Sequence, residues 1–290
     1  MSSIRANGIE IAYEAFGAPA AAPLLLIMGF SAQMIGWEAE FCARLAGRGF
    51  RVIRFDNRDV GLSTKFDDAC PDPGPRFAAA MRGEPFEPVY TLSDMAADAA
   101  GLLAALGIAS AHVVGASMGG FIAQRMALEH APRVRTLTSI MSSTGNPDLP
   151  PASAEALAAL TQPRATSREE AITQGVETWR LLHGPGFRFD EERTRRLVAD
   201  SFDRCFHPNG IARQMLAIRA DGNRKPLLAR VTAPTLVIHG SADRLVPFAA
   251  GRDTAEAIPG ARLVAIEGMG HELPEGAWPQ IIEAIAAHAR

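Results

Sequence analysis

The sequence predicts an α/β protein in which a mostly parallel β-sheet carries helices on both faces and a helical cap is inserted between two strands. Short runs that are apolar throughout, as in strands buried on both faces, alternate along the chain with helical patterns. Residues 145–232 show only helical patterns separated by Pro and Gly, and two apolar strands return after them. We therefore expect a core of residues 1–144 and 233–290 and a helical cap of residues 145–232.

The strands are expected in the core. The first alternates roughly between apolar and polar residues and is closed by Gly17 and Pro19, which is typical of a half-exposed antiparallel strand near a sheet edge. The remaining strands are more continuously apolar. The seven predicted strands span Ile9–Phe16, Pro23–Met28, Phe50–Phe55, Ala111–Gly115, Thr136–Met141, Pro234–His239 and Arg262–Ile266.

Helices are predicted between the strands and through the cap. Ser93 or Asp94 is the expected N-cap of the helix that ends at Leu106, before Gly107. The other predicted core helices span Trp37–Ala46, Met118–His130, Ala249–Ile258 and Pro279–His288, and the cap helices span Ala154–Leu160, Arg168–Leu182, Glu191–Asp200 and Ile211–Arg219.

Composition limits the function classes. A net charge of −3 without a basic tract argues against a nucleic-acid partner or an anionic membrane surface. The apolar runs are too short to span a bilayer, and the N-terminal residues lack a signal-peptide pattern, so a cytoplasmic protein is expected. The three widely spaced cysteines fit a reducing compartment, and without CxxC or His-rich neighbours no metal site is expected.

The most informative motif is the segment from Gly115 to Gly119, which has Ser117 at its centre. It lies between a predicted strand and a predicted helix, where a sharp turn can present a serine hydroxyl above the sheet. Small residues two positions before and after the serine let such a turn close without Cβ clashes. This context favours Ser117 as a nucleophile over a buried turn serine.

A nucleophilic serine needs a base, and the base needs an orienting acid. Asp243 follows the penultimate strand and His271 follows the last one, so both are expected at the strand ends where α/β sheets bind ligands. Asp148 is a second candidate acid because it also follows a core strand. The order Ser117, Asp243, His271 is that of the α/β-hydrolase triad.

An oxyanion formed in acyl transfer is stabilised by backbone N–H groups. The N–H of Met118, directly after the serine, is one expected donor. The loop after the strand Pro23–Met28, which contains Gly29, Phe30 and Ser31, is expected to supply the other, and the turn favours the Phe30 N–H.

With these motifs in place, the chain resembles the α/β-hydrolases over nearly its whole length. The matching segments are Leu24–Gly29, Phe55–Ser63, His112–Gly119, Gly240–Asp243 and Gly268–His271. Within that family, the residues Ile27–Gly29, Gly36–Trp37 and Arg54–Gly61 resemble the aclacinomycin methylesterase-like and small carboxylesterase branch. The resemblance implies ester hydrolysis through an acyl-serine, with a small-molecule ester as substrate and no cofactor.

Other functions remain open for the same constellation. Triad chemistry also serves amidases and aminopeptidases, C–C hydrolases, acyltransferases and perhydrolases. A non-catalytic small-molecule receptor on this fold is a further alternative, although a binder has no need of all three residues. The charged residues of the cap, such as Glu169, Arg168 and Arg193, look like solvated helix faces rather than a site for a free amine. The sequence carries no signal for an oligomeric state.

The candidate substrate pocket combines Gly29 with cap residues. Aromatic and histidine side chains of the cap could contact an apolar acyl group, and the residues proposed for this role are Gly29, Trp179, His183, Phe206 and His207. The loop residues Asp56, Asn57 and Arg58 are expected to be structural.

Overall fold

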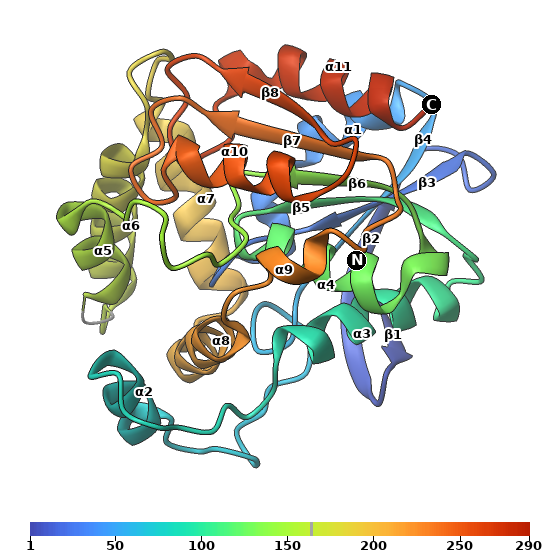
Figure 1. Cartoon of the computed structure of the whole chain (residues 1–290). Coiled ribbons are helices and arrows are strands. Elements are labelled where there is room, and N and C mark those ends of the chain that lie inside the picture. The colour runs from blue at the N-terminus through green and yellow to red at the C-terminus, as the bar shows by residue number, and fades with distance from the viewer. Residues whose placement is uncertain (163–164) are drawn as a thin grey trace.

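The computed structural model describes residues 1–162 and 165–290, so two residues of the expected cap lie outside the described part. An eight-stranded sheet has the order β1-β2-β4-β3-β5-β6-β7-β8 (Figure 1). The two pairs β1–β2 and β2–β4 are antiparallel, and every other neighbouring pair is parallel, which confirms the predicted mostly parallel α/β fold. The strands are β1 (Ser2–Ala6), β2 (Ile9–Phe16), β3 (Ala22–Ile27), β4 (Phe50–Phe55), β5 (Ala111–Ala116), β6 (Val134–Ile140), β7 (Thr235–Gly240) and β8 (Arg262–Ile266).

The edge strand β1 was not among the predicted strands. It pairs with β2 across a tight turn in which Asn7 and Gly8 both have positive φ, 48° and 79°. Asn-Gly is a strong hairpin signal because both residues tolerate that backbone region. The short strand itself is mostly exposed, so it carries little hydrophobic pattern.

Helices cover both faces of the sheet, and alternate residues of β3 show why. Leu25 and Ile27 pack into a core cluster with α3 (Leu92–Ala105) and α4 (Met118–Glu129). Leu24 and Leu26 pack into a second cluster with α1 (Ala39–Ala46) and α11 (Trp278–His288). A short turn η1 (Met34–Gly36) precedes α1, α10 (Phe248–Ala257) joins β7 to β8, and η2 (Ala131–Arg133) and η3 (Glu275–Ala277) are further single turns. Thr91, rather than Ser93 or Asp94, is the N-cap of α3, because the Thr91 and Asp94 side chains form a reciprocal capping box.

Among the described residues, five helices lie between β6 and β7, in the segment where the cap is expected. Figure 1 shows α5, α6 and α7 together at the left of the sheet, whereas α9 lies near α10 and α4. Helix α2 was not predicted and packs against α8 of this group. The bounds are α2 (Gly74–Met81), α5 (Ala154–Thr161), α6 (Arg168–Leu182), α7 (Glu191–Arg204), α8 (Pro208–Asp221) and α9 (Lys225–Leu228). Over the described residues, no helix combines the length and apolarity that a membrane crossing requires.

Candidate active site

Ser117 occupies a sharp turn between β5 and α4. Its backbone is held at φ 55° and ψ −121°, a region that non-glycine residues rarely adopt. A Cβ on Gly115 would lie 2.0 Å from the Gly119 carbonyl oxygen, and one on Gly119 would lie 2.1 Å from that of Ile27. The turn therefore needs glycine at both positions. The Ser117 N–H donates to the Ile140 carbonyl at 2.9 Å, which ties the turn to β6.

His271 lies between Ser117 and Asp243 and contacts both. The distance from His271 Nε2 to Ser117 Oγ is 3.0 Å, and that from His271 Nδ1 to Asp243 Oδ2 is 2.7 Å. The other Asp243 oxygen accepts hydrogen bonds from the N–H groups of Leu245 and Val246. His271 and Asp243 are each only 6% exposed, so water competes little with these bonds.

A second histidine lies near the same carboxylate. His239 Nε2 is 3.6 Å from Asp243 Oδ2 but donates to the Val246 carbonyl at 2.8 Å. Burial lowers the pKa of His239, although Asp243 opposes the shift. His239 thus hydrogen bonds to the Val246 carbonyl, and Asp243 Oδ2 is left to His271 Nδ1. Asp148, the other candidate acid, is exposed. Its backbone N–H donates a hydrogen bond to Asn146 Oδ1 at 3.2 Å.

The loop after β3 runs directly beside Ser117. A Cβ on Gly29 would lie 3.1 Å from the Ser117 Cβ and 3.7 Å from its Oγ. Asn57 Nδ2 donates to the Met28 carbonyl at 2.9 Å, and Gln214 Oε1 accepts from the Ser31 N–H at 3.0 Å. The loop is thus held on both sides of Phe30, whose N–H is one of the two predicted oxyanion donors.

Buried ion pairs join the loop after β4 to helices α7 and α8. Arg213 donates two 2.8 Å hydrogen bonds to the Asp59 carboxylate, with both side chains fully buried. Arg204 donates to Asp56 at 2.6 Å, and Gln214 donates to the Arg58 carbonyl at 2.9 Å. We call this group, Asp56, Asp59, Arg204, Arg213 and Gln214, the charged junction.

The pKa of Asp59 shows how the charges of the charged junction are balanced. Burial alone would raise the pKa of the Asp59 carboxyl, but hydrogen bonds from Arg213 and from the Phe66 N–H bring the pKa below its ordinary value. Asp59 therefore stays ionised and paired. The expectation of a structural loop network is consistent with these contacts, whereas its partners on α7 and α8 were not predicted. These partners on α7 and α8 share one feature. Arg204, Arg213 and Gln214 are polar residues at helix positions that are buried or half-buried.

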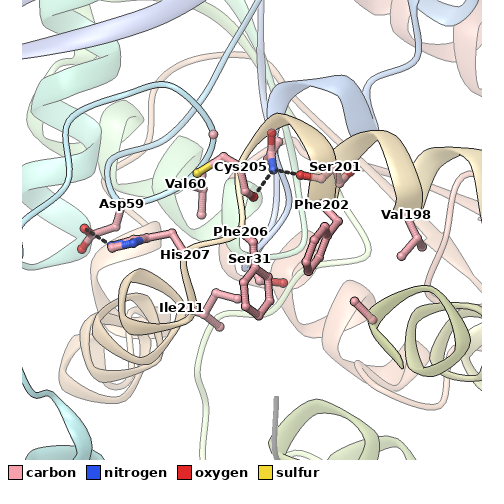
Figure 2. A pocket seen from close by; sticks show the side chains of 13 residues that line it. Ser31, Asp59, Val60, Val198, Ser201, Phe202, Cys205, Phe206, His207 and Ile211 are labelled. Carbon is pink, nitrogen blue, oxygen red and sulfur yellow. Dashed lines mark hydrogen bonds and ion pairs between the residues drawn. The ribbon is translucent and has the colours of Figure 1, made fainter. Parts of the chain in front are cut away.

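A cavity of about 150 Å³ opens next to the charged junction, between core loops and helices α6 to α8 (Figure 2). Its apolar wall includes Phe202 and Phe206, whose ring centroids are 4.7 Å apart, together with Ile211. Ser31, Asp59 and His207 line it as well. Burial lowers the pKa of His207, although Asp67 and Asp59 oppose the shift. Ser117 and His271 are not among the lining residues, but Ser31 is two residues from Gly29, which contacts Ser117.

The structure brings together some of the predicted pocket residues and separates others. Phe206 and His207 line the cavity. His183 instead points to Glu272 and the Phe187 carbonyl, and Trp179 is half-buried without lining the cavity. Arg193, expected on a solvated face, pairs with Glu38 of the core and stacks on the Trp278 ring at 4.8 Å.

A sheet of this topology, with a serine at a strand-to-helix turn and a histidine and an aspartate following the last two strands, defines a hydrolase-type α/β protein. The family model described as "alpha/beta hydrolase fold" matches residues 22–276. The chain therefore belongs to the α/β-hydrolase family, as the sequence motifs predicted.

The relatives point to one branch of that family. The chain is 36% identical to the Rhodomycin D methylesterase DauP of Streptomyces sp. (strain C5), over 96% of this chain and 94% of that protein. It is equally similar to the Rhodomycin D methylesterase DnrP of Streptomyces peucetius, with the same coverage. A solved structure described as a hydrolase from Pseudomonas aeruginosa PA01 superposes with a TM-score of 0.72 at 27% identity, covering 99% of this chain and 97% of that one. The predicted resemblance to methylesterases is thus confirmed.

Proposed function

We propose that this protein hydrolyses carboxylic esters through an acyl-enzyme formed on Ser117. The observation that carries the proposal is the continuous contact from Ser117 Oγ through the His271 ring to the Asp243 carboxylate, at 3.0 and 2.7 Å. Both distances are within hydrogen-bond reach for proton transfer. The similarity to methylesterases supports an ester as the substrate.

Each residue then has one role in the reaction. His271 Nε2 takes the proton of Ser117 as its oxygen attacks the ester carbonyl, and returns a proton to the leaving alcohol. Asp243 holds the His271 Nδ1–H and stabilises the imidazolium. A water molecule, activated by the same histidine, then cleaves the acyl-serine and releases the carboxylic acid.

The N–H groups of Phe30 and Met118 would stabilise the oxyanion. Met118 is the first residue of α4, so its N–H has no partner within the helix and lies at the positive end of the helix dipole. The loop with Phe30 is braced beside the serine by Asn57 and Gln214. Donors fixed in advance need no reorganisation when the charge develops.

We further propose that residues 145–232 act as a cap that selects the acid part of a methyl ester. A methanol leaving group is small, so the acid part would supply most of the contacts. The cavity of about 150 Å³ is of the size that holds a single benzene ring. The Phe202 and Phe206 rings offer a surface for such a ring. Among the residues that line the cavity, Asp59 is the only one with a carboxylate. Because this carboxylate is paired with Arg213, the cavity is not suited to bind a free amine.

Replacing the nucleophile tests the proposal. We expect Ser117→Ala to lower turnover of p-nitrophenyl and methyl esters by roughly 10⁶-fold, because the triad residues act as a unit. The wild-type protein should be labelled by a small fluorophosphonate, and the variant should not. A folded Ser117→Ala protein with near-wild-type ester turnover would rule out the acyl-serine mechanism.

The two candidate acids are distinguished by a pair of matched substitutions. Asp243→Asn should lower kcat/KM by about 10⁴-fold, because the asparagine favours the wrong imidazole tautomer. Asp148→Asn should leave kcat/KM unchanged, since Asp148 is exposed and its side chain has no contact with His271. The reverse ranking in ester kinetics would show that the acid is misassigned.

A further inference from the structure

The loop that carries His271 is held by backbone contacts from the end of α6. The His271 N–H donates to the Leu182 carbonyl at 2.9 Å, and the Gly186 N–H donates to the Gly268 carbonyl at 2.9 Å. The two segments lie so close that a Cβ on Gly270 would be 2.1 Å from the Leu182 carbonyl oxygen. We call this contact between residues 182–187 and 268–272 the backbone junction.

One side-chain pair closes the same junction. Glu272, the residue after His271, accepts a hydrogen bond from the Gly184 N–H at 3.3 Å, and its Oε1 is in close contact with His183 Nδ1. The side chains of His183 and Glu272 are only 10% and 12% exposed. Since the Phe187 carbonyl can only accept, His183 Nε2 carries a proton and donates to it at 2.7 Å.

The Glu272 carboxyl and the His183 ring lie against each other, with Oε1 next to Nδ1. Burial raises the pKa of Glu272, and the hydrogen bond to His183 opposes that shift. The charge of Arg193 also lowers the pKa of Glu272, but Arg193 itself is paired with Glu38. Glu272 is thereby committed to His183 and Gly184, and neither of its partners takes part in the chemistry proposed above.

We propose that Glu272 and His183 are positioning residues for His271, so that the cap holds the catalytic base in place as well as selecting the substrate. The inference rests on the proposed function of the Ser117–His271–Asp243 site. The contact between His183 and Glu272 holds residue 272 against the end of α6. The hydrogen bond from the His271 N–H to the Leu182 carbonyl holds residue 271 against the same segment. Together they fix the main chain from which the imidazole reaches Ser117 and Asp243. A displacement of about 1 Å at such a group is enough to lower turnover by up to about 100-fold.

The test compares Glu272→Ala with Glu272→Gln in the full-length protein. Glu272→Ala should lower kcat for p-nitrophenyl acetate by about 10- to 100-fold with KM little changed, because the base is misplaced rather than the substrate. Labelling of Ser117 by a small fluorophosphonate should slow by the same factor. Glu272→Gln should restore most of both rates, since the amide oxygen still accepts from Gly184.

Glu275→Ala is the matched control. Glu275 lies three residues further on, is 54% exposed and pairs only loosely with Arg44, at 3.8 Å. Its removal should leave kcat and labelling unchanged. His183→Gln changes the other partner of the pair and is the second variant if Glu272→Ala fails to fold cooperatively. It should slow labelling of Ser117 as Glu272→Ala does.

The outcomes separate the two proposals. A wild-type protein that is neither labelled at Ser117 nor active on esters would refute the proposed function. A labelled wild type, with folded Glu272→Ala or His183→Gln protein labelling at the wild-type rate, would refute the positioning role alone. A Glu272→Gln variant as slow as Glu272→Ala would also refute it.

Discussion

The α5–α9 segment meets the core at two junctions that are built in opposite ways. The charged junction joins side chains, with Arg213 on Asp59 and Arg204 on Asp56 fully or nearly buried. The backbone junction joins main chain to main chain, with carbonyl and N–H groups of residues 182–186 against those of residues 268–271. One adjoins the cavity, and the other holds the loop of His271.

This difference predicts different sensitivities to substitution. Buried charges are costly to separate from their partners, so the charged junction should control stability. A close backbone approach tolerates no added side chain, so the backbone junction should control the geometry of the site. Substitutions at each junction therefore test whether the two junctions differ in this way.

The largest effect on stability is expected from Arg213→Met. The substitution leaves the Asp59 carboxylate buried without its cation, which costs about 3–5 kcal/mol of unfolding free energy. Urea unfolding followed by circular dichroism measures the loss. The control is Arg168→Met, whose partner Asp203 is exposed and lies at 2.7 Å, and a much smaller loss is expected there because water solvates both charges. Equal losses in the two variants would contradict the assigned role of burial.

A smaller loss of stability, coupled to a loss of activity, is expected from Gly270→Ala. The new Cβ would meet the Leu182 carbonyl oxygen at 2.1 Å, so the two segments must move apart at a cost of about 1–3 kcal/mol. We expect kcat to fall with it, because His271 is the next residue. Gly47→Ala is the control, since its Cβ would meet no atom nearer than 3.4 Å. A destabilised Gly270→Ala protein with unchanged kcat would separate the junction from catalysis.

The smallest effect is a pH dependence that distinguishes the junctions. Since burial raises the pKa of Glu272 above its ordinary value of 4.5, wild-type stability from this group is present below pH 4.5 and lost as the pH rises through the folded pKa. Glu272→Gln should therefore gain stability relative to wild type as the pH rises above 4.5. Asp59 has the opposite pH dependence. Because its pKa is lowered, its contribution to the free energy of unfolding is lost only as the pH drops below 3.8. Urea unfolding at several pH values tests both, and a Glu272→Gln difference that does not change with pH would contradict the burial of this carboxyl.

The candidate site illustrates how far sequence patterns reach. Gly115, Ser117 and Gly119 form a local turn, so their spacing is visible in the sequence and agrees with the backbone geometry observed. The assignment of Asp243 and His271 relied on a general rule, that parallel strands of one sheet end at the same edge. The structure places both side chains in one chain of contacts with Ser117.

Other parts of the molecule required the tertiary structure. Helix α8 reads as an ordinary amphipathic helix, and nothing local indicates that Arg213 reaches Asp59, which is 154 residues away. His183 was interpreted as a pocket residue because it lies in a cap loop, yet it faces Glu272. The N-cap of α3 was misplaced by two or three residues, because Ser93 and Asp94 also have side chains that can cap a helix.

The class of fold, the family and the order of most strands and helices could thus be predicted from the sequence, because they depend on hydrophobic periodicity and short-range turn chemistry. The exceptions are the short elements β1, α2 and α9. The folded structure was needed to see which face the α5–α9 helices turn to the core and which charges they bury. It was also needed to see that the end of α6 lies against the His271 loop. Such pairings join residues about 90 to 150 positions apart, and their energies come from burial and desolvation, which exist only once the chain has folded.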